Sequence, residues 1–75
     1  MDFSFDKVAD VLYIQILHGI IDESDEIAPG IIVDYSKSKQ ILGLEILNFK
    51  SRDFDLNNLI TLNDDEIIPA IVQCP

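Results

Sequence analysis

Carboxylates are the side chains of this sequence best suited to chemistry, and they occur in two arrangements. Four of them lie in one short segment, at Asp22, Glu23, Asp25 and Glu26. Asp34 and Glu45 instead stand singly inside two apolar runs. Carboxylate oxygens bind divalent cations, and two carboxyl groups held close together can act as general acid and base. One hypothesis is therefore a metal-binding or acid/base site.

The acidic segment falls within an expected strand over residues 20–26. Successive side chains of a strand point to opposite faces, so the four carboxylates cannot all converge on one ion. Calcium sites usually need six to eight oxygens and a loop with a glycine at its sharp turn. We therefore predict no metal site and expect an edge strand whose like charges discourage pairing with other chains. A groove for a basic partner is the intermediate interpretation.

Asp34 and Glu45 lie opposite the apolar side chains of their own strands, and an antiparallel hairpin could make them neighbours. If a second subunit covers that face, burial would favour a protonated carboxyl that acts as acid, base or ligand. The simpler interpretation is that both mark the water-facing side of a half-buried sheet. Because no His, Lys or nucleophile accompanies them, we favour the simpler interpretation and predict no catalytic residue.

One imidazole and two phenols complete the set of candidates. His18, the only histidine, has no partner at metal or triad spacing, so we expect it to be exposed in a turn. Tyr13 and Tyr35 occupy sheet positions where the ring packs and the hydroxyl reaches water, and at a protein interface they would be good anchors. The three glycines form no phosphate-binding loop, so no nucleotide or other cofactor is predicted.

The segments that carry these residues are mostly strands. Apolar alternation between turn signals indicates strands over residues 2–5, 11–17, 20–26, 30–35 and 41–47. Alternation in the last of them puts three apolar residues on one face, namely Leu42, Leu44 and Ile46. We predict an α+β domain: a small antiparallel sheet of about five strands in a meander, with one short C-terminal helix. One sheet face should form the core with that helix.

The chain after residue 50 has a different pattern. Ser51 or Asp53 can cap a short helix there. The apolar run 67–72 contains Pro69, which predicts an edge strand or an extended tail, and the acidic pair at 64–65 predicts a turn before it. We take residues 1–75 as a single domain, with the sheet over 2–49 and the helix and C-terminal extension over 50–75.

Charge and hydropathy limit the partners. Fourteen acidic residues against five basic ones give a net charge of −9, which disfavours nucleic acid and anionic membrane surfaces, both of which are bound by Lys and Arg. A basic protein partner suits this charge. The chain is 48 % hydrophobic, more than one thin core of this size can hide, so we expect a homodimer, a heterologous partner, or both.

Three further features predict a cytoplasmic protein. Cys74 is the only cysteine, so no disulfide can form within the chain, and a lone thiol suits a reducing compartment. The first residues carry an acid at Asp2 and no basic region before an apolar run, unlike a signal peptide. No apolar stretch approaches the roughly 20 residues that span a bilayer.

Three segments resemble a widespread family of small bacterial proteins, catalogued as domain of unknown function 2283. Residues 6–14, DKVADVLYI, resemble the family's "YD…ADALYI" opening. Residues 30–35, GIIVDY, and 42–47, LGLEIL, resemble its "GVIVDYD" and "VVGIEIL" segments. The resemblance covers roughly residues 2 to 49. The chain departs from the family at Phe5, usually Tyr, and at the turn Lys37-Ser38-Lys39, and its tail beyond Arg52 is not covered.

The resemblance implies a small antiparallel β-sheet module, often closed by a helix, with no established activity. It also implies that some members are encoded beside small toxin-like proteins. We therefore predict a non-enzymatic protein–protein interaction module, antitoxin-like or regulatory, that uses Tyr13, Tyr35, Asp34, Glu45 and the acidic segment. The alternative is a small carboxylate-based metal-binding or acid/base enzyme, in which divalent ions would stabilise the chain but not its Asp34→Asn or Glu45→Gln variants.

Overall fold

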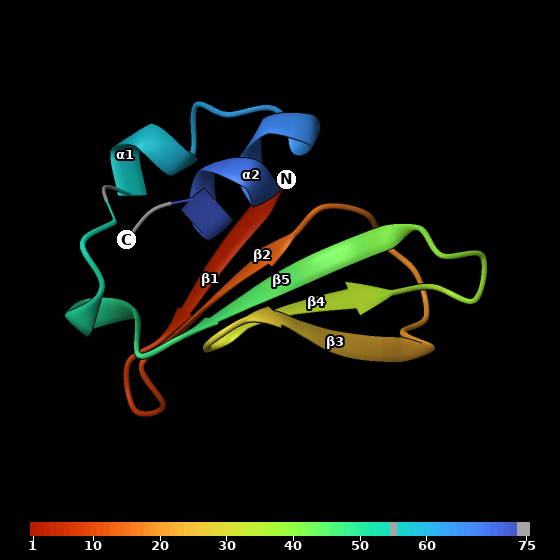
Figure 1. Ribbon diagram of the computed structural model, residues 1–75, viewed down its shortest axis with the longest axis horizontal. Coiled ribbons are helices and arrows are strands. Elements are labelled where there is room, and N and C mark those ends of the chain that lie inside the picture. The colour runs from red at the N-terminus through yellow and green to blue at the C-terminus, as the bar shows by residue number, and fades with distance from the viewer. Residues whose placement is uncertain (55, 74–75) are drawn as a thin grey trace.

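The computed structural model describes residues 1–54 and 56–73. Within them the chain forms five strands and then three short helices (Figure 1): β1 (Asp2–Asp6), β2 (Val11–Gln15), β3 (Glu23–Ala28), β4 (Ile31–Tyr35), β5 (Ile41–Leu47), the 3-10 helix η1 (Phe49–Ser51), α1 (Leu56–Leu59) and α2 (Asp64–Gln73). The Cys74 thiol considered above lies outside the described residues.

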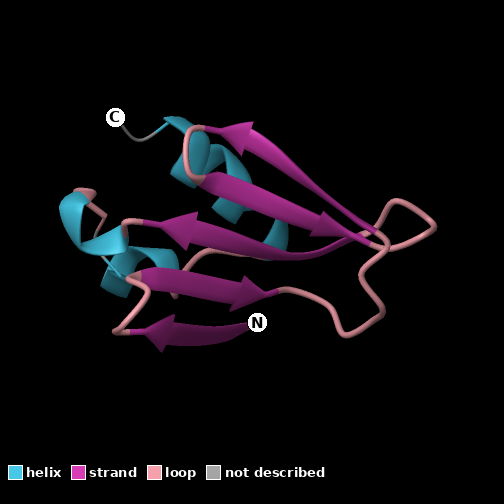
Figure 2. Cartoon of the chain, turned by 90° about the horizontal axis from the view of Figure 1, so that it is seen from below, coloured by secondary structure: helices cyan, strands magenta, loops and turns pink. Residues whose placement is uncertain are grey.

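The strands form one antiparallel sheet in the order β1-β2-β5-β4-β3. Three of the four sequential strand pairs are neighbours, and the long connection from β2 to β3 lets β5 lie between β2 and β4 (Figure 2). The predicted α+β class, with a five-stranded antiparallel sheet, is confirmed. The acidic strand β3 lies at one edge, as like charge along its length predicts.

Short polar side chains and a glycine shape the two tightest turns. Asp6 Oδ1 accepts hydrogen bonds from the amides of Val8 and Ala9, at 3.0 and 3.1 Å, and so closes the turn between β1 and β2. Gly30, which follows Pro29 between β3 and β4, has φ 74°, a conformation that favours glycine. The turn signals of the sequence therefore act locally, through hydrogen bonds and backbone freedom.

The core lies between the sheet and the helices, which all lie on one side of it (Figure 1). The sheet and the helices both contribute buried apolar side chains: Leu12, Ile14, Ile31, Val33, Leu44 and Ile46 from the strands, and Leu59, Ile67 and Ile71 from α1 and α2. Burial of apolar side chains is the main favourable term in folding. The C-terminal helices therefore share one core with the sheet and cover one of its faces.

A β-bulge changes the predicted alternation in β5. The register with β4 shifts at its end, so that Tyr35 lies opposite Ile41 and Leu42 becomes an extra residue. Ile41 packs against the core, whereas Leu42 is buried outside the core cluster, against Gly19. Leu42 is buried as predicted, and the inserted residue brings Ile41, which strict alternation puts on the opposite face, to the core as well.

The tail prediction is also wrong, because residues 64–73 form a helix. The carbonyl of Asn63 accepts the first helical hydrogen bonds, and Glu66 Oε1 accepts one from the Asn63 amide at 2.9 Å, in the manner of a capping box. The acidic pair at 64–65 thus begins α2 instead of a turn. Ile67 and Ile71, one helical turn apart, are fully buried, and their burial outweighs the local preference of Pro69 against a helix.

The short helix expected after residue 50 is present as α1, but Ser51 does not cap it. Ser51 lies in η1 and donates a hydrogen bond from its hydroxyl to the carbonyl of Asn48 at 2.9 Å. Among the described residues, no helix is both long enough and apolar enough to cross a bilayer.

Replacing Pro69 by Ala should stabilise the protein. Pro69 lies in the second turn of α2, is exposed, and cannot donate a backbone hydrogen bond to the carbonyl of Asp65. Restoring that donor should raise the free energy of unfolding by about 1–2 kcal/mol. This is less than the roughly 3 kcal/mol by which a proline in the middle of a helix is less favourable than alanine. Urea unfolding of both chains measures the change, and a less stable Pro69→Ala variant would contradict the helical assignment.

Candidate functional site

The sheet face away from the helices collects most of the polar strand residues. By strand register its positions are Asp2, Ser4, Asp6, Val11, Tyr13, Gln15, Ser24, Glu26, Ile32, Asp34, Gly43, Glu45 and Leu47. We call this set the uncovered face; Figure 2 looks onto it, with the helices behind the sheet. Five of its positions are carboxylates, and none is basic.

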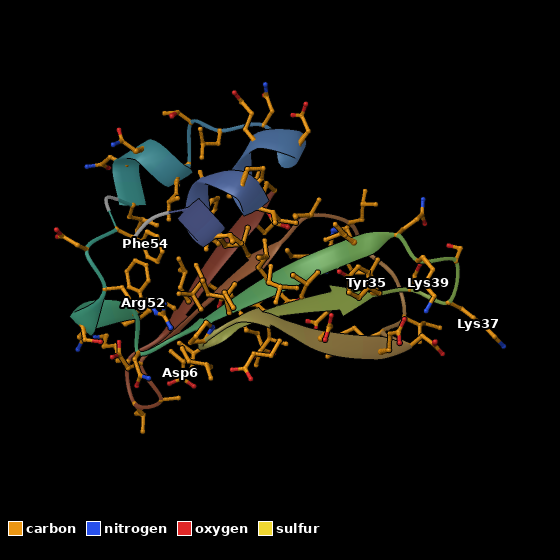
Figure 3. The ribbon with its side chains drawn as sticks, viewed as in Figure 1. Asp6, Tyr35, Lys37, Lys39, Arg52 and Phe54 are labelled. Atoms are coloured by element: carbon orange, nitrogen blue, oxygen red, sulfur yellow. The ribbon has the colours of Figure 1, made fainter. Side chains whose placement is uncertain are left out.

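The basic residues lie in turns, loops and the helix η1, at the two ends of the molecule. None of the five lies in a described strand. Figure 3 shows Lys37 and Lys39 at one end and Arg52 at the other. Arg52 donates hydrogen bonds to the carbonyls of Leu47 and Pro29, both at 2.7 Å, and so links the end of β5 to the turn between β3 and β4. The uncovered face therefore has no basic residue among its strand positions to offset its acidic charge.

Tyr13 lies over Gly43 on the uncovered face, because Gly43 has no side chain to occupy that space. A Cβ atom on Gly43 would stand 2.8 Å from Cζ of Tyr13 and closer still to its hydroxyl. Gly43 pairs with Gln15 on one side and with Asp34 on the other. The glycine thus forms a notch between strands, and the phenol of Tyr13 fills it and reaches toward Asp34.

Asp34 is buried, although no helix covers its side of the sheet. Only 2 % of its surface is exposed, and it is the only buried polar or charged residue among the described ones. Its cross-strand partner Ser24 donates a hydrogen bond from Oγ to Asp34 Oδ1 at 2.6 Å. Asp34 Oδ2 has no hydrogen-bond partner. The simpler interpretation, that Asp34 faces water, is therefore wrong.

Tyr13, Asp34 and Glu45 come together in one place. Glu45 pairs directly with Tyr13 across β2 and β5, and Asp34 lies diagonally beyond Gly43. Burial raises the pKa of the Tyr13 phenol, and the charge of Asp34, its interaction with the hydroxyl, and the charge of Glu45 raise it further. We call these three residues the Tyr13 cluster. The strand pairing thus puts the phenol of Tyr13 beside two carboxylates.

The Tyr13 titration can be measured directly. In a Tyr35→Phe background, we expect Tyr13 to ionise above the ordinary value of 10.0, and Asp34→Asn to bring its pKa down toward that value. A raised pKa means that the folded state holds the proton more tightly than the unfolded chain does. The associated stability should be complete below pH 10.0 and be lost as the pH rises through the Tyr13 pKa. Tyrosinate absorbance follows the titration; an unchanged value in Asp34→Asn would contradict the cluster.

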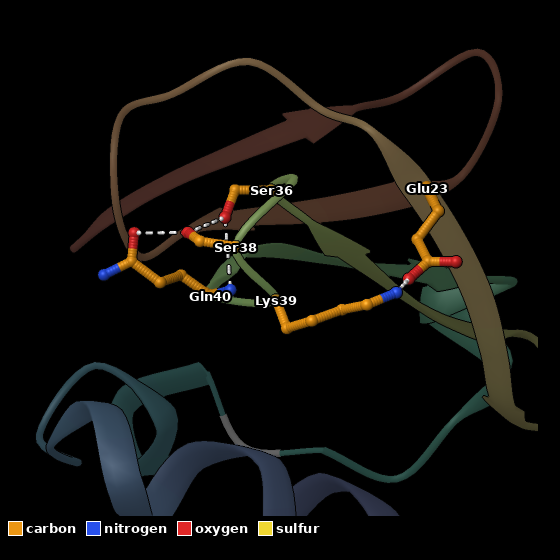
Figure 4. Close-up of polar contacts among 5 residues, drawn as sticks. All are labelled: Glu23, Ser36, Ser38, Lys39 and Gln40. Carbon is orange, nitrogen blue, oxygen red and sulfur yellow. Dashed lines mark hydrogen bonds and ion pairs between the residues drawn. The ribbon is translucent and has the colours of Figure 1, made fainter.

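The other predicted anchor, Tyr35, lies apart from this cluster. Tyr35 packs against the core side of the sheet, where it pairs with Glu23. A partner laid flat on one face of the sheet therefore contacts only one of the two tyrosines. The side chain of Glu23 forms an ion pair with Lys39, whose ammonium reaches it from the loop between β4 and β5 (Figure 4). Glu23 raises the pKa of Lys39 through this hydrogen bond and its charge.

The four acidic residues of the edge segment diverge, as strand geometry requires. Asp22 precedes β3, Glu23 and Asp25 lie on the helix side, and Glu26 lies on the uncovered face. Glu26 is used locally, because its Oε2 accepts a hydrogen bond from the Gly30 amide at 3.0 Å. In the part of the chain that the structure describes, no three His, Cys, Asp or Glu residues are placed to hold a metal ion.

His18 is well exposed, as expected for a turn residue. Its Nδ1 lies 3.2 Å from Nε2 of Gln15, and its Nε2 lies 4.0 Å from a carboxylate oxygen of Asp2. These are surface contacts between exposed side chains, and such pairs contribute little to stability.

Two residues of the site are absent from the sequence predictions. Ser24 supplies the hydrogen bond to Asp34, and Gly43 supplies the notch beneath Tyr13. Gly43 does carry a signal, because a glycine inside a regular strand often marks the close approach of another group. Ser24 carries no comparable signal, since its position depends on the register between β3 and β4.

The comparison with protein families agrees with the resemblance seen in the sequence. A family model with the description "Protein of unknown function (DUF2283)" matches residues 2–50. The chain belongs to this family. The match covers all five strands and ends in η1, so the family relationship includes the uncovered face but not α1 or α2. No significant match was found among curated proteins or solved structures.

Proposed function

We propose that this chain is a non-enzymatic interaction module whose uncovered face binds a basic protein. The observation that carries the proposal is the charge of that face: five carboxylate positions and no base on the described strands. Complementary charge speeds the encounter of two proteins and selects against wrong partners. The net charge of −9 extends the same preference over the whole chain.

The composition of the uncovered face also supports a protein as the ligand. Val11, Ile32 and Leu47 lie on it as half-buried apolar side chains, on the same face as the ring of Tyr13. Interfaces combine such apolar and aromatic contacts with a polar rim. A basic protein with an apolar centre to its own surface would match both properties.

A second copy of the chain suits this face poorly. Self-pairing would bring like carboxylates together, and juxtaposed like charges cost several kcal/mol by general estimates. We therefore assign the uncovered face to a basic partner. The expected homodimer stays a prediction for another surface, and sedimentation velocity of the isolated chain measures it.

The finer role that we propose is antitoxin-like or regulatory. An acidic module that covers the basic surface of its partner would prevent that surface from binding nucleic acid, which depends on Lys and Arg. A reducing cytoplasm is the compartment that we propose for this role.

The test compares two charge reversals. The chain is immobilised, basic proteins retained from a lysate at low salt are identified, and each purified candidate is titrated against wild type, Glu45→Lys and Asp25→Lys. Glu45 lies on the uncovered face, whereas the matched control Asp25 lies at an edge position on the helix side.

We expect binding that weakens with salt and that falls at least tenfold more in Glu45→Lys than in Asp25→Lys, because only Glu45 would contact the partner. Equal effects of the two reversals, or no purified basic protein that binds, would reject the proposed function.

A further inference from the structure

Asp34 is the buried carboxylate of the uncovered face. It is 98 % buried on a face without a covering layer, and Oδ2 has no hydrogen-bond partner. A buried carboxylate oxygen without a donor destabilises a fold. Among the described residues, neither Asp34 nor Glu45 takes part in an ion pair. Within the described residues, no basic side chain therefore offsets the charge of Asp34.

The room for a compensating charge lies above Gly43. Because this residue has no side chain, the phenol of Tyr13 occupies the space above it, between the positions of Asp34 and Gln15. Rotation of the Tyr13 side chain away from Gly43 would open the notch and bring Asp34 Oδ2 within reach. Glu45, directly opposite Tyr13, would then stand at the rim of the same notch.

We propose that this notch receives one arginine side chain of the basic partner, with Tyr13 moving out as the guanidinium enters. The inference rests on the proposed function and adds the chemistry of the central contact. A guanidinium is planar and smaller than the phenol it replaces. Its five N–H donors can reach Asp34 Oδ2 and the Glu45 carboxylate together, which a lysine ammonium, a single point of charge, does less well.

The displaced Tyr13 ring would also contribute. Aromatic rings attract guanidinium groups placed over their faces, so the ring can cover the bound side chain and exclude water from it. Exclusion of water strengthens the contact between the guanidinium and the carboxylates. Tyr13 thus has two positions: over Gly43 in the free chain, and over the guanidinium in the complex.

The test uses a small probe, so that it does not depend on the identity of the partner. The labelled protein is titrated with N-acetyl-arginine methylamide and followed by NMR at the Tyr13 ring and the Gly43 amide. The control is the citrulline analogue, which has the same shape without the charge. We expect weak, saturable shifts centred on these two residues with the arginine probe, and none with citrulline.

Two variants make the test specific. Asp34→Asn keeps an oxygen that accepts the hydrogen bond from Ser24 but removes the buried charge. It should weaken the binding of the arginine probe at least tenfold. Its melting temperature should equal or exceed that of wild type, because the side chain loses an uncompensated carboxylate. The matched control Asp25→Asn removes an exposed carboxylate at the helix side of β3 and should leave binding unchanged.

Several results would reject the arginine site. Shifts spread over all acidic residues, equal binding by citrulline, or equal losses in Asp34→Asn and Asp25→Asn would each reject it. Binding of a purified basic protein distinguishes a failure of the arginine site from a failure of the proposed function. If a purified basic protein responds to Glu45→Lys but not to Asp34→Asn, the face binds a partner without an arginine in the notch. If neither variant changes its binding, both proposals are wrong.

Discussion

Ile67→Ala should lower the free energy of unfolding by about 2–5 kcal/mol, the range measured for large-to-small changes at fully buried positions. Ile67 has no exposed surface and belongs to the cluster that joins α2 to the sheet. Truncation would remove its apolar contacts and leave a cavity between the two layers. For a 75-residue domain this loss is a large part of the total stability, which for single domains is about 5–15 kcal/mol.

The matched control for Ile67 is Val72→Ala in the same helix. Val72 is 42 % exposed, so its truncation removes less buried area than that of Ile67, and Ala has the higher helix propensity. We expect a change within about 0.5 kcal/mol for this variant. Urea unfolding with both fluorescence and circular dichroism measures the two variants. Equal stabilities of Ile67→Ala and wild type would show that α2 does not close the core.

Gly43→Ala should lower the free energy of unfolding by about 2–3 kcal/mol, in the upper part of the range for overpacked positions. The new Cβ would stand 2.8 Å from Cζ of Tyr13 and 2.9 Å from the carbonyl oxygen of Ile14. Tyr13 can rotate away, but the backbone of β2 can yield only by distorting the sheet. The variant should therefore combine lower stability with a Tyr13 ring displaced from Asp34.

Both effects of Gly43→Ala can be measured together. Thermal unfolding gives the stability, and tyrosinate absorbance shows whether the Tyr13 pKa falls as the phenol leaves the carboxylates. The matched control is Gly19→Ala, whose Cβ would meet only the flexible end of Leu42, at 3.0 Å, and should cost little. A Gly43→Ala variant as stable as Gly19→Ala would contradict the position of Tyr13.

Sequence periodicity identified the sheet and the sides of its strands. Side chains alternate along a strand irrespective of what packs on either face, so the pattern in β4 and β5 was enough to put Asp34 and Glu45 opposite the core. The edge position of the acidic strand also follows from its composition, since like charges are tolerated where one side of a strand stays unpaired.

The partner of Asp34 could not be predicted in this way. Regular pairing around the turn at Pro29-Gly30 would have put Asp25 opposite Asp34, two carboxylates against each other. The bulge at Ile27 shifts the register by one residue and puts Ser24 there instead, where it donates a hydrogen bond. A bulge depends on how the two strands fit the rest of the sheet, so no local pattern announces it.

The C-terminal third shows the same difference between local and long-range effects. Pro69 and the acidic pair at 64–65 favour a turn and an extended tail by local preference, yet these residues form α2. Ile67 and Ile71 decide the outcome, because a helix turns both toward the apolar face of the sheet while its backbone hydrogen bonds are satisfied within the helix. Local propensities amount to a few kcal/mol at most, and burial against distant residues exceeds them.

Residue types and their spacing were thus sufficient for the fold class, the sign of the charge and the side on which the residues of β2, β4 and most of β5 lie. The folded chain alone reveals that Tyr13 covers Gly43, that Ser24 meets Asp34, and that Asp34 Oδ2 is buried without a donor. The physical reason is the separation along the sequence over which each property acts. Alternation and charge are properties of neighbouring residues, whereas burial and hydrogen-bond partners arise when strands distant in the sequence are brought into register.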